Sequence, residues 1–154
     1  MTTSSATTVR NRVDPVSRGH AESSFMTTVE KTSALAGRIL LSGLFLFSGL
    51  GKIGAYAASA GYMAALGVPT ALLPLAIATE VLGAIAIILG WQTRVTAFLL
   101  AGYSLLTALI FHTNFADQIQ TVMFLKNLSI AGGFLLLVAN GAGALSLDRR
   151  SDRK

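Results

Sequence analysis

Four ionisable side chains lie inside or at the ends of strongly apolar stretches of this sequence. Glu80 is near the middle of one stretch and Lys126 lies a few residues inside another, whereas Lys52 and His112 lie at the ends of two more. An ionised side chain at the centre of a bilayer costs about 2.5–3.5 kcal/mol on insertion scales, so such residues commonly have a function. A carboxylate, two ammonium groups and an imidazole can exchange protons and hold a polar ligand.

Opposite charge and similar depth predict an ion pair between Glu80 and Lys126, with Lys52 or Arg38 as the alternative partner of Glu80. Glu80 lies about nine residues, or ~13 Å, from the outer end of its stretch, and Lys126 about five residues, or ~8 Å. A lysine side chain can cover that difference. The pair has two interpretations, a purely structural contact or the lining of a substrate or proton site. His112 likewise is either a proton donor at the outer mouth or an interfacial residue that fixes a helix end.

Several kinds of chemistry are excluded. The chain has no cysteine, which removes disulfides, thiol catalysis and cysteine-ligated metal sites. The second histidine, His20, lies in the N-terminal tail, so haem ligation by two histidines is not expected, and one His with one Glu is too few for a metal. We expect no intrinsic metal, haem or flavin site. Nucleic acid is not expected as a partner either, because no basic stripe with interleaved aromatic residues occurs.

The elements that must position these residues are transmembrane helices. The 154 residues are 53% hydrophobic and only 12% charged, against roughly 25% charged in soluble domains. Backbone polar groups in lipid must be satisfied within a segment, which favours helices, and about 20 residues cross the hydrocarbon. The sequence therefore predicts an all-α membrane protein, a bundle of four transmembrane helices. Its apolar runs are residues 34–53, 71–90, 95–112 and 121–146.

The distribution of Lys and Arg predicts the orientation. Basic residues precede the first run, occupy the tight turn at 91–95 and follow the last run, whereas the other two connections hold few. The positive-inside rule then places both termini in the cytoplasm. We expect a disordered cytoplasmic tail at 1–33, a membrane domain at 34–148 and a basic cytoplasmic tail at 149–154. Residues 54–70 should form a short interfacial helix that ends before Pro69.

Each predicted helix has a polar or small face that should turn inward. The neighbours of Glu80 on its own face are mostly small, whereas the opposite face is mostly bulky, which suits lipid. The inward faces of the other helices combine Arg38, Ser42, Gly49 and Lys52 in the first, Thr96, Tyr103 and Thr107 in the third, and Lys126, Ser129, Gly133 and Asn140 in the fourth. Arg38 either extends to the inner surface or reaches toward Glu80.

Three segments together resemble one family of bacterial membrane proteins. These are GRILLSGLFLFSGLGKIGAYAASAGYMAALGVP, ATEVLGAIAIILGWQTR and FHTNFADQIQTVMFLKNLSIAGGFLLL. They resemble the DoxX family over about residues 35–148. The resemblance implies four helices, a bacterial inner membrane and redox work, because members are often described as subunits of quinol oxidases. The charged motif residues of the family fall on Arg38, Lys52, Glu80 and Lys126.

The first functional hypothesis is a membrane oxidoreductase subunit that uses a quinone. Lys126 or His112 would donate to a quinone carbonyl, and Glu80 would take or give the proton. Electrons would come from a redox partner subunit, and a homo-oligomer is a further partner to consider. The runner-up is a transporter of a small solute through the same pocket, and a third hypothesis is a non-catalytic assembly or stress factor. The residues expected to bind substrate are Arg38, Lys52, Tyr103, Thr107 and Asn127.

Overall fold

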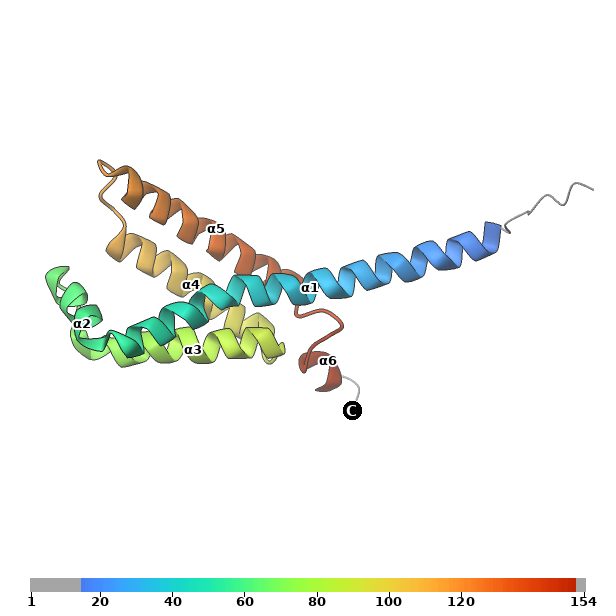
Figure 1. Ribbon diagram of the computed structural model, residues 1–154, viewed down its shortest axis with the longest axis horizontal. Helices are drawn as coiled ribbons and strands as arrows, with labels where there is room; N and C mark the ends of the chain where they lie inside the picture. The colour runs from blue at the N-terminus through green and yellow to red at the C-terminus, as the bar shows by residue number, and fades with distance from the viewer. Residues whose placement is uncertain (1–14, 152–154) are drawn as a thin grey trace, which may run out of the picture. The chain divides into compact units, whose positions relative to one another are not determined.

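The computed structural model describes the backbone of residues 15–151, and every regular element within this range is a helix. The chain divides into two units, residues 1–30 and 31–154. The elements are α1 (Pro15–Gly54), α2 (Tyr56–Ala65), the short 3-10 helix η1 (Thr70–Leu72), α3 (Leu73–Leu89), α4 (Thr93–Phe111), α5 (Gln118–Asn140) and α6 (Asp148–Ser151) (Figure 1).

Helix α1 begins earlier than the sequence suggests. The predicted tail at 1–33 is helical from Pro15 onward, and residues 1–14 lie outside the described residues. Proline suits the first turn of a helix, where its missing N–H is not needed. The hydroxyls of Thr27 and Thr28 donate to the carbonyls of Ser23 and Ser24 one turn back. Polar residues here are thus compatible with a helix, whereas the sequence predicts a disordered tail over this segment.

The four-span fold is confirmed. Within residues 15–151, four helices are long and apolar enough to cross a membrane: Met26–Gly54, Thr70–Leu89, Thr93–Phe111 and Gln118–Asn140. Large apolar side chains are exposed along them; on α3 these include Leu75, Leu82 and Leu89. Lipid is the solvent that accepts such a surface. The direction in which the chain crosses the membrane stays a prediction from the Lys/Arg asymmetry.

Small residues allow the helices of the second unit to approach closely. A Cβ added at Gly49 of α1 would lie 2.7 Å from Val81 Cγ2 of α3, and one added at Gly83 of α3 would lie 3.0 Å from a Leu100 methyl of α4. Gly133 of α5 faces a side chain of α1 in the same way. In this unit α3 follows the second half of α1, and α4 and α5 form an antiparallel pair (Figure 1). The glycines therefore lie at helix contacts, as is common in membrane bundles.

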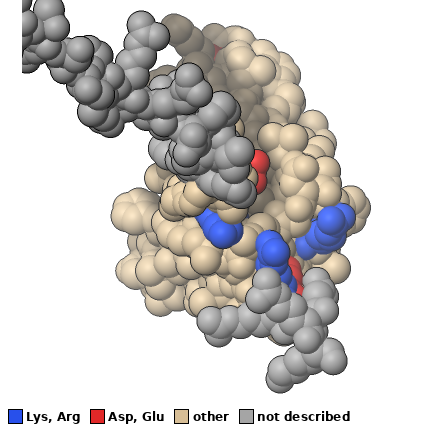
Figure 2. All heavy atoms as spheres, turned by 90° about the vertical axis from the view of Figure 1, so that its right-hand side faces the viewer, with Lys and Arg blue, Asp and Glu red and all other residues tan. Residues whose placement is uncertain are grey.

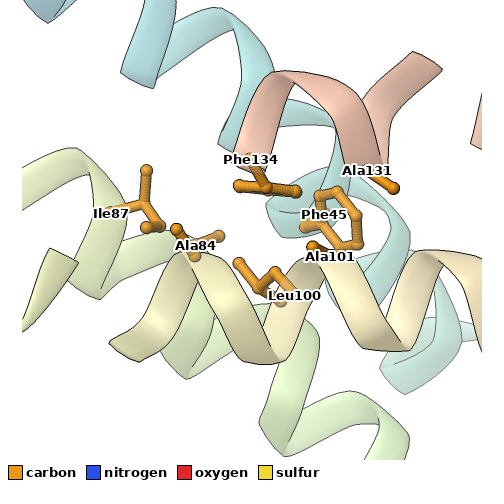
Figure 3. Close-up of a cluster of buried hydrophobic side chains, with 8 residues drawn as sticks. Phe45, Ala84, Ile87, Leu100, Ala101, Ala131 and Phe134 are labelled. Atoms are coloured by element: carbon orange, nitrogen blue, oxygen red, sulfur yellow. The ribbon is translucent and has the colours of Figure 1, made fainter. Parts of the chain in front are cut away.

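The centre of the bundle is a cluster of small and aromatic side chains (Figure 3). Phe45 of α1 and Phe134 of α5 meet edge to face with ring centroids 5.3 Å apart. Around them lie buried alanines from α3, α4 and α5, together with Ile87 and Leu100. All four spanning helices thus contribute to one core.

The fourth span is shorter than predicted. The sequence indicates apolar character to residue 146, but α5 ends at Asn140, because Gly141 and Gly143 both adopt positive φ angles, 75° and 77°. The chain then returns to the end of α3. There Leu147 N donates to Leu89 O and Asp148 N donates to Gly90 O. We call this the α6 end of the bundle and the opposite end, which carries α2, the α2 end.

Candidate functional site

A cavity of about 570 Å³ lies at the α2 end of the bundle. Most of its wall is aliphatic or aromatic. All the residues predicted to act in a site, except Arg38, line it: Lys52, Glu80, Tyr103, Thr107, His112, Lys126 and Asn127. Side chains from four spanning helices and from α2 therefore converge there, as the polar helix faces predicted.

Glu80 holds the polar centre of this cavity. It is only 4% exposed. Lys52 Nζ donates to both of its carboxylate oxygens, each at 2.9 Å, and the Tyr103 hydroxyl donates to Oε1 at 2.7 Å. Lys52 also donates to Ser48 Oγ at 2.7 Å, one turn back on α1. The carboxylate thus has partners from two other helices, which offsets the cost of removing its charge from water.

The ion pair differs from the predicted one. Glu80 pairs with Lys52, and this is the sole salt bridge in the part of the chain that the structure describes. Lys126 is exposed at the cavity rim, and its Nζ lies 3.1 Å from Met123 Sδ on its own helix. Depth, counted in residues along each helix, predicts that Lys126 and Glu80 lie near one another, and both line the cavity. It carries no information on direction around the helix axis, which decides the partner.

Three other predicted residues have local partners. Thr107 Oγ1 donates to Ser104 O, and Asn127 Nδ2 donates to the carbonyl of Met123 at 3.1 Å. His112 Nδ1 lies 2.8 Å from Gln120 Oε1 and follows the last residue of α4. All three line the cavity, and the contact of His112 with Gln120 joins the end of α4 to α5.

Two pairs of aromatic rings line the cavity. Phe45 lies in the wall with its ring centroid 6.3 Å from that of Tyr103, and it belongs to the central core as well. Tyr62 of α2 stacks on Phe111 of α4 with centroids 5.7 Å apart. Ser48 and Phe45 were not predicted as site residues. The spacing of Ser48, four residues before Lys52, is the signal that could have identified it.

Arg38 lies outside the cavity, at the α6 end. It is fully buried, and its guanidinium donates to Ile87 O at 3.4 Å and to the carbonyl of Leu145. Its guanidinium does not contact Glu80, and it is covered by other segments of the chain rather than exposed at the end of the bundle. Backbone carbonyls at the end of α3 and in the returning C-terminal segment are its partners. Its role in the described structure is to join these segments.

Asp148 completes the α6 end. Its Oδ1 accepts from Gln92 N at 2.7 Å and its Oδ2 from Thr93 N at 2.9 Å, so it caps the start of α4 from a distant part of the chain. Partial burial acts to raise the pKa of Asp148. The hydrogen bonds from Thr93 and Gln92, together with the charge of Arg38, outweigh burial and hold this pKa below its ordinary value.

No group of three or more His, Asp or Glu side chains that could hold a metal ion occurs among the described residues. The polar centre consists instead of a paired carboxylate, a phenol and ammonium groups. Such a set can donate hydrogen bonds to a carbonyl and move protons.

These features define a class, a four-span helical membrane protein with a buried ion pair facing an apolar cavity. The family model "DoxX" matches residues 33–113. The chain is 49% identical over 129 residues to "Inner membrane protein YqjF" of Escherichia coli (strain K12), which covers 84% of this chain and 99% of that protein. It is 42% identical over 123 residues to "Inner membrane protein YphA" of the same organism, covering 75% and 88%. No solved structure matches the chain.

The chain belongs to the DoxX family, and it is a multi-pass protein of the bacterial inner membrane.

Proposed function

We propose that the cavity at the α2 end binds a quinone, and that the protein serves as a subunit of a membrane oxidoreductase. The observation that carries this proposal is the combination of an apolar cavity with one polar centre. Ligand pockets of roughly 300–1,000 Å³ commonly combine apolar walls with a few placed polar groups, and the cavity measures about 570 Å³. A quinone head group, with its ring and its carbonyl acceptors, fits that chemistry.

The walls support a ligand that arrives from the lipid. Leu75 and Leu106 line the cavity, yet they are 64% and 55% exposed on the surface of the bundle. The cavity therefore borders the surface that faces lipid. A ligand with an isoprenoid tail could keep that tail in the bilayer while its head group enters.

The polar residues divide into donors and a proton relay. Lys126 and His112, which border the cavity, are the donors for the carbonyl oxygens. Tyr103 and Lys52 are hydrogen-bonded to Glu80, so these three groups can pass a proton inward or outward. Conversion of a quinone to a quinol takes up two electrons and two protons. The electrons would come from a redox centre in a partner subunit, and the protons would pass through this relay.

A transporter is the alternative use of the same cavity. It would need a path to the α6 end. Along α1 the cavity residues Lys52, Ser48 and Phe45 are followed by Ser42 and Arg38, both fully buried. This packing between the two ends favours a ligand that enters and leaves on one side.

The experiment uses the purified protein in lipid nanodiscs with a short-chain ubiquinone. Native mass spectrometry should detect the bound quinone. In the matched variants, Ala76→Phe fills the cavity, because Ala76 lines it, whereas Ala78→Phe adds the same ring two residues on, outside the lining. We expect the first to abolish binding and the second to retain it. Absence of binding to the unsubstituted protein, or equal binding to both variants, would contradict the proposal.

A further inference from the structure

A second cavity, of about 800 Å³, lies at the α6 end, where α4 begins and α5 ends. Its lining is mainly polar, in contrast to the cavity around Glu80. The polar lining residues include Gln92, Arg94, Asn140, Ser146, Asp148 and Arg149. It does not share a lining residue with the first cavity.

The charges around this cavity do not cancel. Asp148 has both carboxylate oxygens bonded to the backbone N–H groups of Gln92 and Thr93. Within the described residues, neither Arg94 nor Arg149 has a carboxylate at salt-bridge distance. Among the described residues, two guanidinium groups therefore border the cavity without a carboxylate in a salt bridge to them, and guanidinium groups are well suited to phosphate oxygens.

Arg94 bends toward the end of α5. A Cβ added at Gly141 would lie 3.7 Å from Arg94 Nε and 3.8 Å from Nη2. The guanidinium thus lies over the turn that follows α5, at the cavity wall. Figure 2 looks onto the α6 end and shows Lys and Arg side chains, in blue, gathered there.

The surroundings place this cavity at the level of lipid head groups. Val95, which lines the cavity, is 58% exposed, and Leu99 one turn further along α4 is 60% exposed. Trp91, at the turn before α4, is 59% exposed, and exposed tryptophans gather at the membrane–water boundary. An apolar face that begins directly beside two arginines suits an acyl chain joined to an anionic head group.

We infer that the cavity at the α6 end binds the phosphate of an anionic phospholipid, with Arg94 and Arg149 on the phosphate oxygens. The amide side chain of Gln92 adds hydrogen-bond donors around it, and Asn140 has one amide proton left beyond its bond to Leu136 O. The acyl chains lie along the exposed face of α4 that begins at Val95. The site is independent of the ligand in the first cavity.

The test measures lipid retention in mild detergent by native mass spectrometry, with phosphatidylglycerol or phosphatidylcholine added. We expect the protein to retain more phosphatidylglycerol than phosphatidylcholine. Arg94→Gln and Arg149→Gln should each lower it by about tenfold, as loss of a charged hydrogen-bond partner does. Arg94→Lys keeps the charge but loses the paired N–H donors of the guanidinium. Its retention of phosphatidylglycerol should lie between that of the unsubstituted protein and that of Arg94→Gln. Lys31→Gln, which removes a positive charge outside the cavity lining, is the matched control and should change nothing.

Four results would overturn the inference. Equal retention in all variants would show that the arginines do not hold lipid, and equal loss in Lys31→Gln would show a general charge effect. If Arg94→Gln loses thermal stability but retains lipid unchanged, Arg94 only stabilises the turn after α5 and does not bind lipid. A separate arm adds inorganic phosphate. If it displaces phosphatidylglycerol at millimolar concentration in an Arg94-dependent manner, the ligand is soluble phosphate and the lipid assignment fails.

Discussion

The two ends of the bundle bury a charge in different ways. At the α2 end, Glu80 has side-chain partners and faces a cavity. At the α6 end, Arg38 is fully buried and donates to the backbone carbonyls of Ile87 and Leu145. A charge surrounded by backbone acceptors joins segments of the fold, whereas a charge with exchangeable side-chain partners beside a cavity can act on a ligand. The contrast separates a charge that joins segments of the fold from one that we propose acts on a ligand.

The largest loss of stability is expected from a substitution that disrupts the packing at the α6 end. A Cβ at Gly90 would lie 2.1 Å from Arg38 Nη1 and 2.5 Å from Ser146 Cβ, and Gly90 has a φ of 67°. We expect Gly90→Ala to cost at least about 4 kcal/mol, since it combines overpacking with backbone strain. Gly67→Ala is the matched control, because Gly67 has a φ of 72° with nothing within 4 Å. It should cost about 1–2 kcal/mol from strain alone. Thermal unfolding in detergent measures both, and equal costs would contradict the tight packing around Arg38.

The next effect tests the partner of Glu80. Lys52→Met should cost about 3 kcal/mol, because it leaves a buried carboxylate unpaired. Lys126→Met should have little effect on stability, because Lys126 is exposed. Adding Glu80→Gln to Lys52→Met should recover most of the loss, which thermal unfolding of these three variants and the unsubstituted protein would show. A larger loss of stability in Lys126→Met than in Lys52→Met would instead support the Glu80–Lys126 pair predicted from the sequence.

A smaller effect concerns the contact that brings Glu80 to α1. A Cβ at Gly49 would lie 2.7 Å from Val81 Cγ2 and 3.2 Å from Glu80 Cβ. Gly49→Ala should therefore cost about 1–3 kcal/mol as the helices separate. Gly43→Ala, on the same helix with nothing within 4 Å, should be neutral or stabilising by up to about 1 kcal/mol. Similar melting temperatures for the two variants would argue against close packing of α1 on α3.

The smallest effect is a pH dependence at Asp148. Its pKa is held below the ordinary value of 3.8, so the folded protein favours the charged form. This contribution is present above pH 3.8 and is lost as the pH falls through the lowered pKa. Thermal unfolding of Asp148→Asn should thus show a weaker fall in stability below pH 4 than the unsubstituted protein does. If the two proteins lose stability in parallel as the pH falls, the charge of Asp148 does not stabilise the α6 end.

The sequence predicts most of the fold because lipid imposes simple rules. Glu80 is buried and Leu75 and Leu82 are exposed, as the contrast between small and bulky faces of that helix indicates. The same rule is wrong for the fourth helix, where Ser129 and Asn140 are exposed. Both donate to carbonyls of their own helix, Ser129 to Leu125 O and Asn140 to Leu136 O. A polar side chain that is satisfied locally has no need to face the interior.

The rest of the site depends on contacts between distant segments. Arg38 bonds to Leu145, 107 residues away in the chain, and this follows from the early end of α5 at two glycines with positive φ. No local pattern around Arg38 indicates that return. The choice of Lys52 over Lys126 likewise depends on how the helices are rotated, which periodicity alone does not determine. Sequence therefore identified which residues share a cavity, but not all of their partners.

The most direct test of a quinone at the α2 end is the infrared spectrum of a short-chain quinone with a ¹³C-labelled carbonyl. Hydrogen bonds from Lys126 or His112 should move the carbonyl stretch of the bound quinone to lower wavenumber than that of the same quinone in empty detergent. Substitution of the responsible donor, in Lys126→Met or in His112→Ala, should remove that shift while the fold is retained. A spectrum identical to that in detergent alone, or a shift unchanged in both variants, would contradict the account.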